Sequence, residues 1–137
     1  MSVTSTAGLE KSLSRLLADT VHRAGFHRAL VCTQDGLLIA SSAPGGDGRD
    51  ERLAALVAIF DDVVLRARRD LDAAAVDELT LLDANVGRMV VRPLAEAPEG
   101  RMFLVVEAPR PASWRRHTGA LRTEVVDRLR AAFPEAS

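Results

Sequence analysis

The residues whose types and spacing could do chemistry are few, and the first of them form a glycine-rich loop before a helix. Residues 45–48 read Gly-Gly-Asp-Gly, and a loop of this kind can bind phosphate at the N-terminus of the helix that follows. The loop lacks the lysine and the serine or threonine of a P-loop, and Asp47 and Asp50 would repel phosphate. We therefore interpret residues 43–50 as a flexible surface loop.

The other reactive side chains do not form a catalytic or metal-binding pattern. His22, His27 and His117 are far apart in the sequence and lie outside any metal-ligand motif. The adjacent acids at 61–62 and 77–78 diverge on a helix or a strand, so they cannot share a proton. Cys32 is the only cysteine, and in a buried strand it acts as a small hydrophobe. The sequence predicts a protein that is not an enzyme and that needs no cofactor or metal.

Composition indicates a single folded domain. The chain has 137 residues, of which 47% are hydrophobic and 27% are charged. A formal net charge of −1 is unlike that of a nucleic-acid-binding protein, so no nucleic-acid partner is expected. The N-terminus has no secretion signal, and no apolar run is long enough to span a membrane. We expect a cytoplasmic protein without membrane insertion.

The elements that must position these residues begin with a hairpin. Apolar runs at 27–33 and 37–42 flank Asp35-Gly36, a pair typical of a tight turn between two strands. Helical spacing predicts a first helix over 9–24, with Gly25 as its C-cap. Residues 1–8 are expected to be a disordered lead, 9–133 the folded domain, and 134–137 a tail.

The second half of the chain predicts two more helices and three more strands. A helix over 52–71, with Asp50 as its N-cap, has a core stripe of leucine, valine, phenylalanine and alanine that runs from Leu53 to Leu71. Strands are predicted at 76–83, at 88–94 (stopped by Pro93) and at 102–107, and a last helix follows from Trp114 to Ala132. The order αββαβββα predicts an α/β (α+β) fold: a five-stranded, mainly antiparallel sheet with three helices.

In order and spacing these elements resemble the roadblock domain, a dynein light-chain type that bacteria have as mutual gliding protein B. The resemblance covers 9–133 and rests on LVCTQDGLLIASS, ERLAALVAIFDDV, ELTLLDANVGRMVVRPL, MFLVVEA and GALRTEVVDRL. Residues 110–117 depart from it, since they are bulkier and more basic than the short linker expected before Gly119. Profilin-like and PAS-like folds share a similar plan of sheet and helices.

The resemblance implies a homodimer that binds a small Ras-like GTPase, modulates its nucleotide cycle and hydrolyses nothing itself. In such dimers the third strand, here about 76–83, pairs with its twin, and the two second helices lie side by side as the partner platform. Similar bacterial proteins accompany a sensor-kinase-like protein. A PAS-like small-ligand sensor and a pure interaction scaffold in bacterial signalling are the alternatives.

The second helix supports this interpretation from its own residues. The candidate interface residues on this helix lie away from the core stripe: Ala55, Ala58, Ile59, Asp62 and Arg66. Leu65 is also off the stripe, and a helix that is apolar around most of its circumference is usually buried around most of it. The alternative is that the alanines are present only because alanine favours helix formation. Ile59 and Leu65 favour an interface.

The third predicted strand and the last helix carry two weaker signals. Leu79 and Leu81 share one face of the strand and Leu82 lies on the other, which suits an edge that pairs with a second copy. A monomer whose edge is protected by charged residues 77–78 is the alternative. The six arginines between 110 and 130 are interpreted as a solvated helix face, with a docking patch for an acidic partner as the other possibility.

Overall fold

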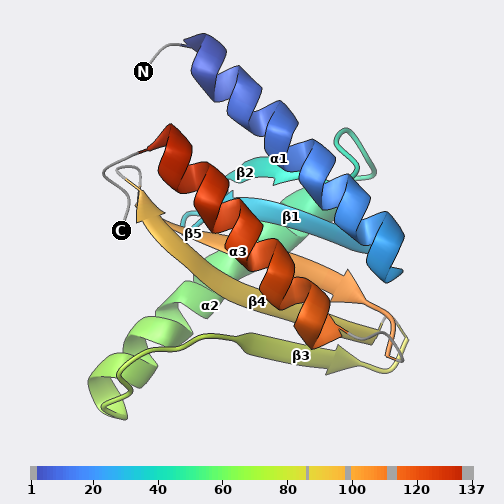
Figure 1. Ribbon diagram of the computed structural model, residues 1–137. Helices are drawn as coiled ribbons and strands as arrows, with labels where there is room; N and C mark the ends of the chain where they lie inside the picture. Colours follow the sequence, from blue (N-terminus) through green and yellow to red (C-terminus); the bar gives the residue numbers. More distant parts are fainter. Residues whose placement is uncertain (1–2, 86, 98–99, 111–113, 134–137) are drawn as a thin grey trace.

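The protein is a sheet with one helix on one face and two helices on the other (Figure 1). The computed structural model describes residues 3–85, 87–97, 100–110 and 114–133. The element order, αββαβββα, is the predicted one: α1 Val3–Ala24, β1 Arg28–Thr33, β2 Leu38–Ser41, α2 Arg49–Asp70, β3 Leu79–Asp83, β4 Gly87–Ala97, β5 Gly100–Ala108 and α3 Trp114–Ala132. The strand order is β2-β1-β5-β4-β3, and all neighbouring strands are antiparallel.

Two apolar clusters hold the helices to the sheet. Alternate side chains of the central strands point to opposite faces, so Leu104 and Val106 of β5 pack under α1 and α3, whereas Phe103 and Val105 pack under α2. Most of the apolar side chains on the helices' inner faces complete these clusters: Leu13, Leu16, Leu17, Leu121, Val125 and Leu129 on one side, and Leu53, Ala54 and Val57 on the other. The sheet is therefore buried on both faces over its central strands.

The helix boundaries differ from the prediction in three places. Helix α1 begins at Val3 and not at Leu9: no proline lies in 3–8, and Gly8 is accommodated within the helix. The N-cap of α2 is Gly48, at φ 87°, and not Asp50, whose carboxylate is instead bound by side chains of β1 and β2. Leu71 is not in the core stripe, since α2 ends at Asp70 and Leu71 is 79% exposed. The predicted tail at 134–137 lies outside the described residues.

The largest differences in strand boundaries are at β3 and β4, whereas β1, β2 and β5 differ from the prediction by one or two residues at their ends. Strand β4 does not stop at Pro93 but continues to Ala97, with an irregularity in its pairing with β5 between Pro93 and Glu96. Proline has no N–H to donate, and such a local break in the ladder accommodates it within a strand. Strand β3 begins only at Leu79, so it is shorter than the predicted 76–83.

Candidate functional site

Helix α2 has one buried side and one exposed apolar side. Its buried side contacts β1, β2 and β5. On the exposed side Ile59, Val63 and Leu65 are 60%, 43% and 42% exposed, and Ala55 and Ala58 are exposed as well. Large apolar side chains that water can reach in a group are typical of a surface that binds another protein. All five α2 residues predicted as interface candidates lie on this side, which we call the α2 surface.

The α2 surface has two flanks. Successive helical residues are rotated by about 100°, so Ile59 and Val63 lie on the flank next to Leu56, while Ala58 and Leu65 lie on the opposite flank. Between the flanks, Arg66 donates from Nε to the carboxylate of Asp62 at 2.9 Å. Both of these side chains are more than 60% exposed, so the pair contributes no more than about 1 kcal/mol to stability. Its charges are available to a partner.

Strand β3 is an edge strand that pairs only with β4 among the described strands. Leu79 and Leu81 face the α2 side, opposite Val91 and Met89, and Leu82 faces the other side, opposite Arg88. Leu79 is half-buried, whereas Leu81 and Leu82 are 49% and 52% exposed. The outer edge of β3 therefore combines backbone groups free to pair with apolar side chains on both faces.

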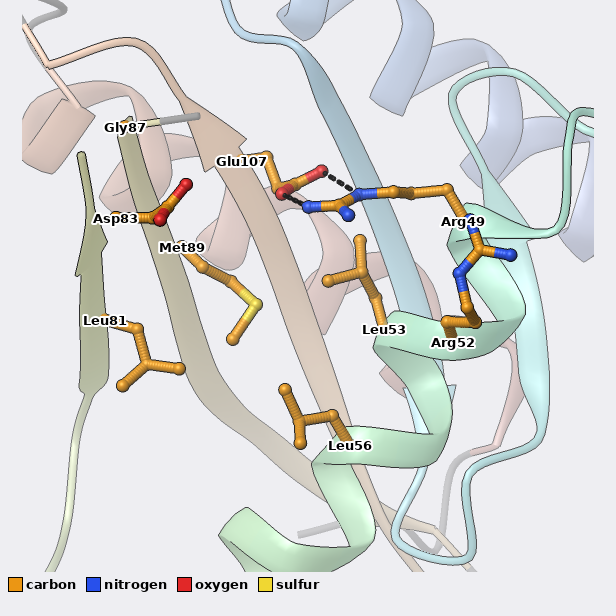
Figure 2. A pocket seen from close by; sticks show the side chains of 9 residues that line it. All are labelled: Arg49, Arg52, Leu53, Leu56, Leu81, Asp83, Gly87, Met89 and Glu107. Carbon is orange, nitrogen blue, oxygen red and sulfur yellow. Dashed lines mark hydrogen bonds and ion pairs between the residues drawn. The ribbon is translucent and has the colours of Figure 1, made fainter. Parts of the chain in front are cut away.

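A cavity of about 420 Å³ separates α2 from the edge of the sheet (Figure 2). Leu53 and Leu56 of α2 face Met89 and Leu81 across it, and Arg49, Arg52, Asp83, Gly87 and Glu107 complete its lining. The cavity lies between the Leu56 flank of α2 and β3. Leu81 lines this cavity, and Ile59 lies about one helical turn after Leu56, which lines it from α2.

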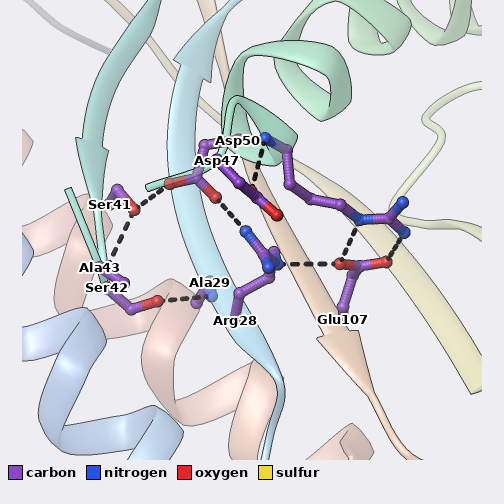
Figure 3. A network of polar contacts seen from close by, with 9 residues as sticks. Arg28, Ala29, Ser41, Ser42, Ala43, Asp47, Asp50 and Glu107 are labelled. Carbon is purple, nitrogen blue, oxygen red and sulfur yellow. Dashed lines mark hydrogen bonds and ion pairs between the residues drawn. The ribbon is translucent and has the colours of Figure 1, made fainter. Parts of the chain in front are cut away.

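An ion-pair network fixes the N-terminus of α2 to the sheet (Figure 3). Glu107 of β5 is 3% exposed, and its carboxylate binds Arg49 of α2 and Arg28 of β1, the latter at 3.0 Å. Arg28 also donates to Asp50 at 2.9 Å, and the hydroxyl of Ser41 donates to the same carboxylate. The hydrogen bond and the negative charge of Glu107 raise the pKa of Arg49 above its ordinary value. The network sets where α2 starts on the sheet.

A second ion pair fixes the middle of α2. Asp61, on the buried side of the helix, accepts hydrogen bonds from Nε and Nη2 of Arg101 at 2.9 and 2.7 Å. Sequence reasoning found neither of the two ion-pair clusters, because the partners are far apart in the chain: 40 residues for Asp61–Arg101 and 58 for Arg49–Glu107. Two features of the sequence could have indicated these ion pairs: a glutamate inside the apolar run of β5 and an aspartate on the inner side of α2.

The predicted reactive residues do not gather into a site. The backbone N–H of Arg49 hydrogen-bonds to Asp47 and lowers the pKa of that carboxyl, and His22 and His27 are exposed. Burial raises the pKa of the Cys32 thiol to about 12, so it carries no thiolate at neutral pH. Over the described part of the chain no group of three or more metal-binding side chains lies together. None of the helices described is long and apolar enough to cross a membrane.

Comparison with known proteins identifies the fold. No protein-family model and no curated protein matches the sequence. Among solved structures, MglB in a tetrameric arrangement superposes with a TM-score of 0.73 at 18% identity, covering 91% of this chain and 93% of that one. The gliding protein MglB of Thermus thermophilus gives 0.72 at 18% identity over 90% and 92%. A Roadblock/LC7 domain from Streptomyces avermitilis gives 0.68 at 20% identity over 86% and 94%. The predicted roadblock fold is confirmed.

Proposed function

We propose that this protein is a non-catalytic homodimeric regulator that binds a small Ras-like GTPase and modulates its nucleotide cycle. The observation that carries the proposal is the α2 surface, an apolar helix side left open next to an open edge strand on a roadblock fold. The tetrameric arrangement in which a protein of the same fold is described supports the proposal of self-association. The proposed location is the cytoplasm, and a sensor-kinase-like protein is a further proposed partner.

The two flanks of the α2 surface suit different partners. Antiparallel pairing of two β3 edges would join two sheets into one and bring the Leu56 flank of each α2, with Ile59 and Val63, toward its twin. That contact would also bury Leu81 and fill the cavity beside it. The Asp62–Arg66 pair and the opposite flank, with Ala58 and Leu65, would remain exposed as the platform for the GTPase.

The mechanism needs no chemistry from this chain. A GTPase exchanges between conformations that depend on its nucleotide, and a partner shifts that equilibrium only by binding one conformation more tightly than the other. The platform offers apolar contacts from Ala55, Ala58 and Leu65, together with one negative and one positive side chain. A selective contact with one nucleotide state would change either hydrolysis or exchange.

Replacing Ile59 with aspartate tests the interface. Burying an unpaired carboxylate in a contact between two helices should weaken dimerisation by about 2 kcal/mol or more, roughly 30-fold in affinity. Because Ile59 is 60% exposed in one copy, the variant should fold normally. Sedimentation equilibrium measures the dissociation constant, and circular dichroism checks the fold.

The matched control is Leu37→Asp. Leu37 is 66% exposed, and its side chain lines a cavity on the α1 side of the sheet, whereas it is the neighbouring Gly36 that approaches Ala54 and Ala55 of α2. This variant should therefore associate like the original protein. An Ile59→Asp variant that associates as tightly as the control would remove the basis of the proposed interface.

A small-ligand sensor is the second candidate, because a further cavity could hold a ligand. It has a volume of about 370 Å³ and lies between α1, the β1–β2 hairpin and the end of α3, with mostly apolar lining: Leu9, Leu37, Leu38, Ile39, Met102, Leu129 and Phe133. A ligand that copurifies with the protein and is released on unfolding, detected by mass spectrometry, would favour this candidate.

A further inference from the structure

A group of arginines lies on the face of the sheet opposite α2, where β4 meets α3. Arg88 and Arg92 alternate along β4 with Met89 and Val91, which pack on the α2 side, so their side chains point to the α3 side. On α3, helical spacing places three arginines on the flank that faces β4 and β3. We call this group the basic face: Arg88, Arg92, Arg115, Arg122 and Arg130.

Direct contacts bring the members of the basic face together. The guanidinium groups of Arg88 and Arg115 lie 5.0 and 4.5 Å from the centre of the Trp114 ring. Arg122 donates from Nε to the carbonyl oxygen of Pro93 at 2.8 Å, one residue after Arg92. The side chain of Arg92 lies against α3 at Gly119, where its Nη1 would be 3.7 Å from an added Cβ. The basic face is thus one surface built from a strand and a helix.

Within the described part of the chain, no carboxylate forms an ion pair with the basic face. Arg88, Arg92 and Arg122 are nevertheless half-buried. Arg88 Nε is buried and has no hydrogen-bond partner among the described residues.

Acidic residues near the basic face compensate its positive charge only in part. Asp77 offers its backbone oxygen to Arg92 at 3.4 Å, and the carboxylate of Glu78 accepts a hydrogen bond from Thr80. Desolvation, and then the positive charge of Arg92, lower the pKa of Arg122, and the negative charge of Asp77 offsets this only in part. Desolvated cations gathered without an anion raise the free energy of the free protein, and a bound anionic group lowers it.

We propose that the basic face binds an acidic segment of a partner protein. Guanidinium groups bind carboxylates through two parallel hydrogen bonds, and Arg88 and Arg92 lie about 13 Å apart along an extended strand, so one segment can reach both. Leu82, 52% exposed on the same face of β3, offers an apolar contact beside the charges. An amphipathic acidic helix or strand fits this combination.

Two other anionic surfaces fit the basic face less well. A flat membrane contacts side chains that protrude, whereas Arg88, Arg92 and Arg122 are half-buried against α3. Proteins that bind single-stranded nucleic acid commonly stack its bases on exposed aromatic rings, and Trp114 is only 7% exposed, with two guanidinium groups on its ring. The basic face lies across the sheet from the α2 surface, so its partner is additional to the one proposed there.

The test is a fluorescence-anisotropy titration of the full chain with a labelled amphipathic peptide that has glutamates on one side and leucines on the other. We expect binding that weakens as salt rises, and no binding of the same peptide with glutamine in place of glutamate. Arg92→Gln with Arg122→Gln should weaken binding at least about tenfold, and so should the exposed Arg115→Gln, which poses less risk to folding.

The controls separate this proposal from the proposed function. Arg116→Gln, on the exposed outer side of the same helix, should bind the peptide within about twofold of the original protein. Ile59→Asp should bind it equally well, even though its dimerisation is weakened. Equal affinities in all variants would overturn the proposal. So would tighter binding of phosphatidylglycerol vesicles or single-stranded DNA than of the peptide through the same arginines.

Discussion

Glu107→Gln should lower the free energy of unfolding by about 3 kcal/mol, because it leaves Arg28 and Arg49 without their shared carboxylate. Glu107 is 3% exposed, whereas the two arginines have side chains 26% and 37% exposed, so water compensates for part of the loss. We therefore expect the lower end of the cost of breaking a buried ion pair. The glutamine keeps the size of the side chain, and the effect then reports the charge alone.

Urea denaturation at neutral pH measures this effect, with Asp62→Asn as the matched control. Asp62 also loses an arginine partner, but both side chains of that pair are exposed, so the control should change stability by less than about 1 kcal/mol. Amide hydrogen exchange should also accelerate in the first turns of α2, since the network holds that end of the helix. If Glu107→Gln and Asp62→Asn unfolded at the same urea concentration, the ion-pair network would not be what holds α2 on the sheet.

Gly87→Ala should be the most disruptive single substitution at the edge of the sheet. Gly87 starts β4 at φ +112°, and an added Cβ would lie 2.5 Å from the carbonyl oxygen of Ala108 and 3.1 Å from the backbone of Arg110. These are backbone atoms, so they cannot move aside as a flexible side chain would. We expect a loss of about 3 kcal/mol or more in stability, together with weaker pairing of β3 and β4 and weaker dimerisation.

Gly25→Ala is the control that separates the penalty of a positive φ from the steric clash expected at Gly87. Gly25 also has positive φ, +71°, but nothing lies within 4 Å of an added Cβ, so the variant should lose only about 1 kcal/mol. Thermal unfolding followed by circular dichroism compares the two variants. Similar melting temperatures would contradict the close approach of Gly87 to β5.

The sequence predicted the elements well where local patterns decide them. Asp35-Gly36 lies in the turn of a hairpin, and helical spacing located all three helices. The errors occurred where distant residues decide the outcome. Asp50 is a good N-cap residue, but Arg28 and Ser41 bind its carboxylate within the folded chain. Pro93 usually ends a strand, but an irregular pairing with β5 lets β4 continue past it.

The candidate site was also predictable only where local sequence patterns determine it. Ile59 departs from the core stripe of its own helix, so periodicity alone indicated an exposed apolar side chain. The position of β3 at the sheet edge came only from the family resemblance, because strand order depends on long-range pairing. The arginines between 110 and 130 were interpreted as a solvated helix face, since sequence cannot show that Arg92 of β4 lies against α3 beside Arg122.

Titration calorimetry of this protein with the small Ras-like GTPase encoded nearest to it, loaded in turn with GDP and with a GTP analogue, tests the central claim most directly. We predict affinities that differ by about tenfold or more between the two nucleotide states, and much weaker binding by Ile59→Asp than by Leu37→Asp. Equal affinity for both states, or binding to neither, would contradict the proposed regulation of a GTPase.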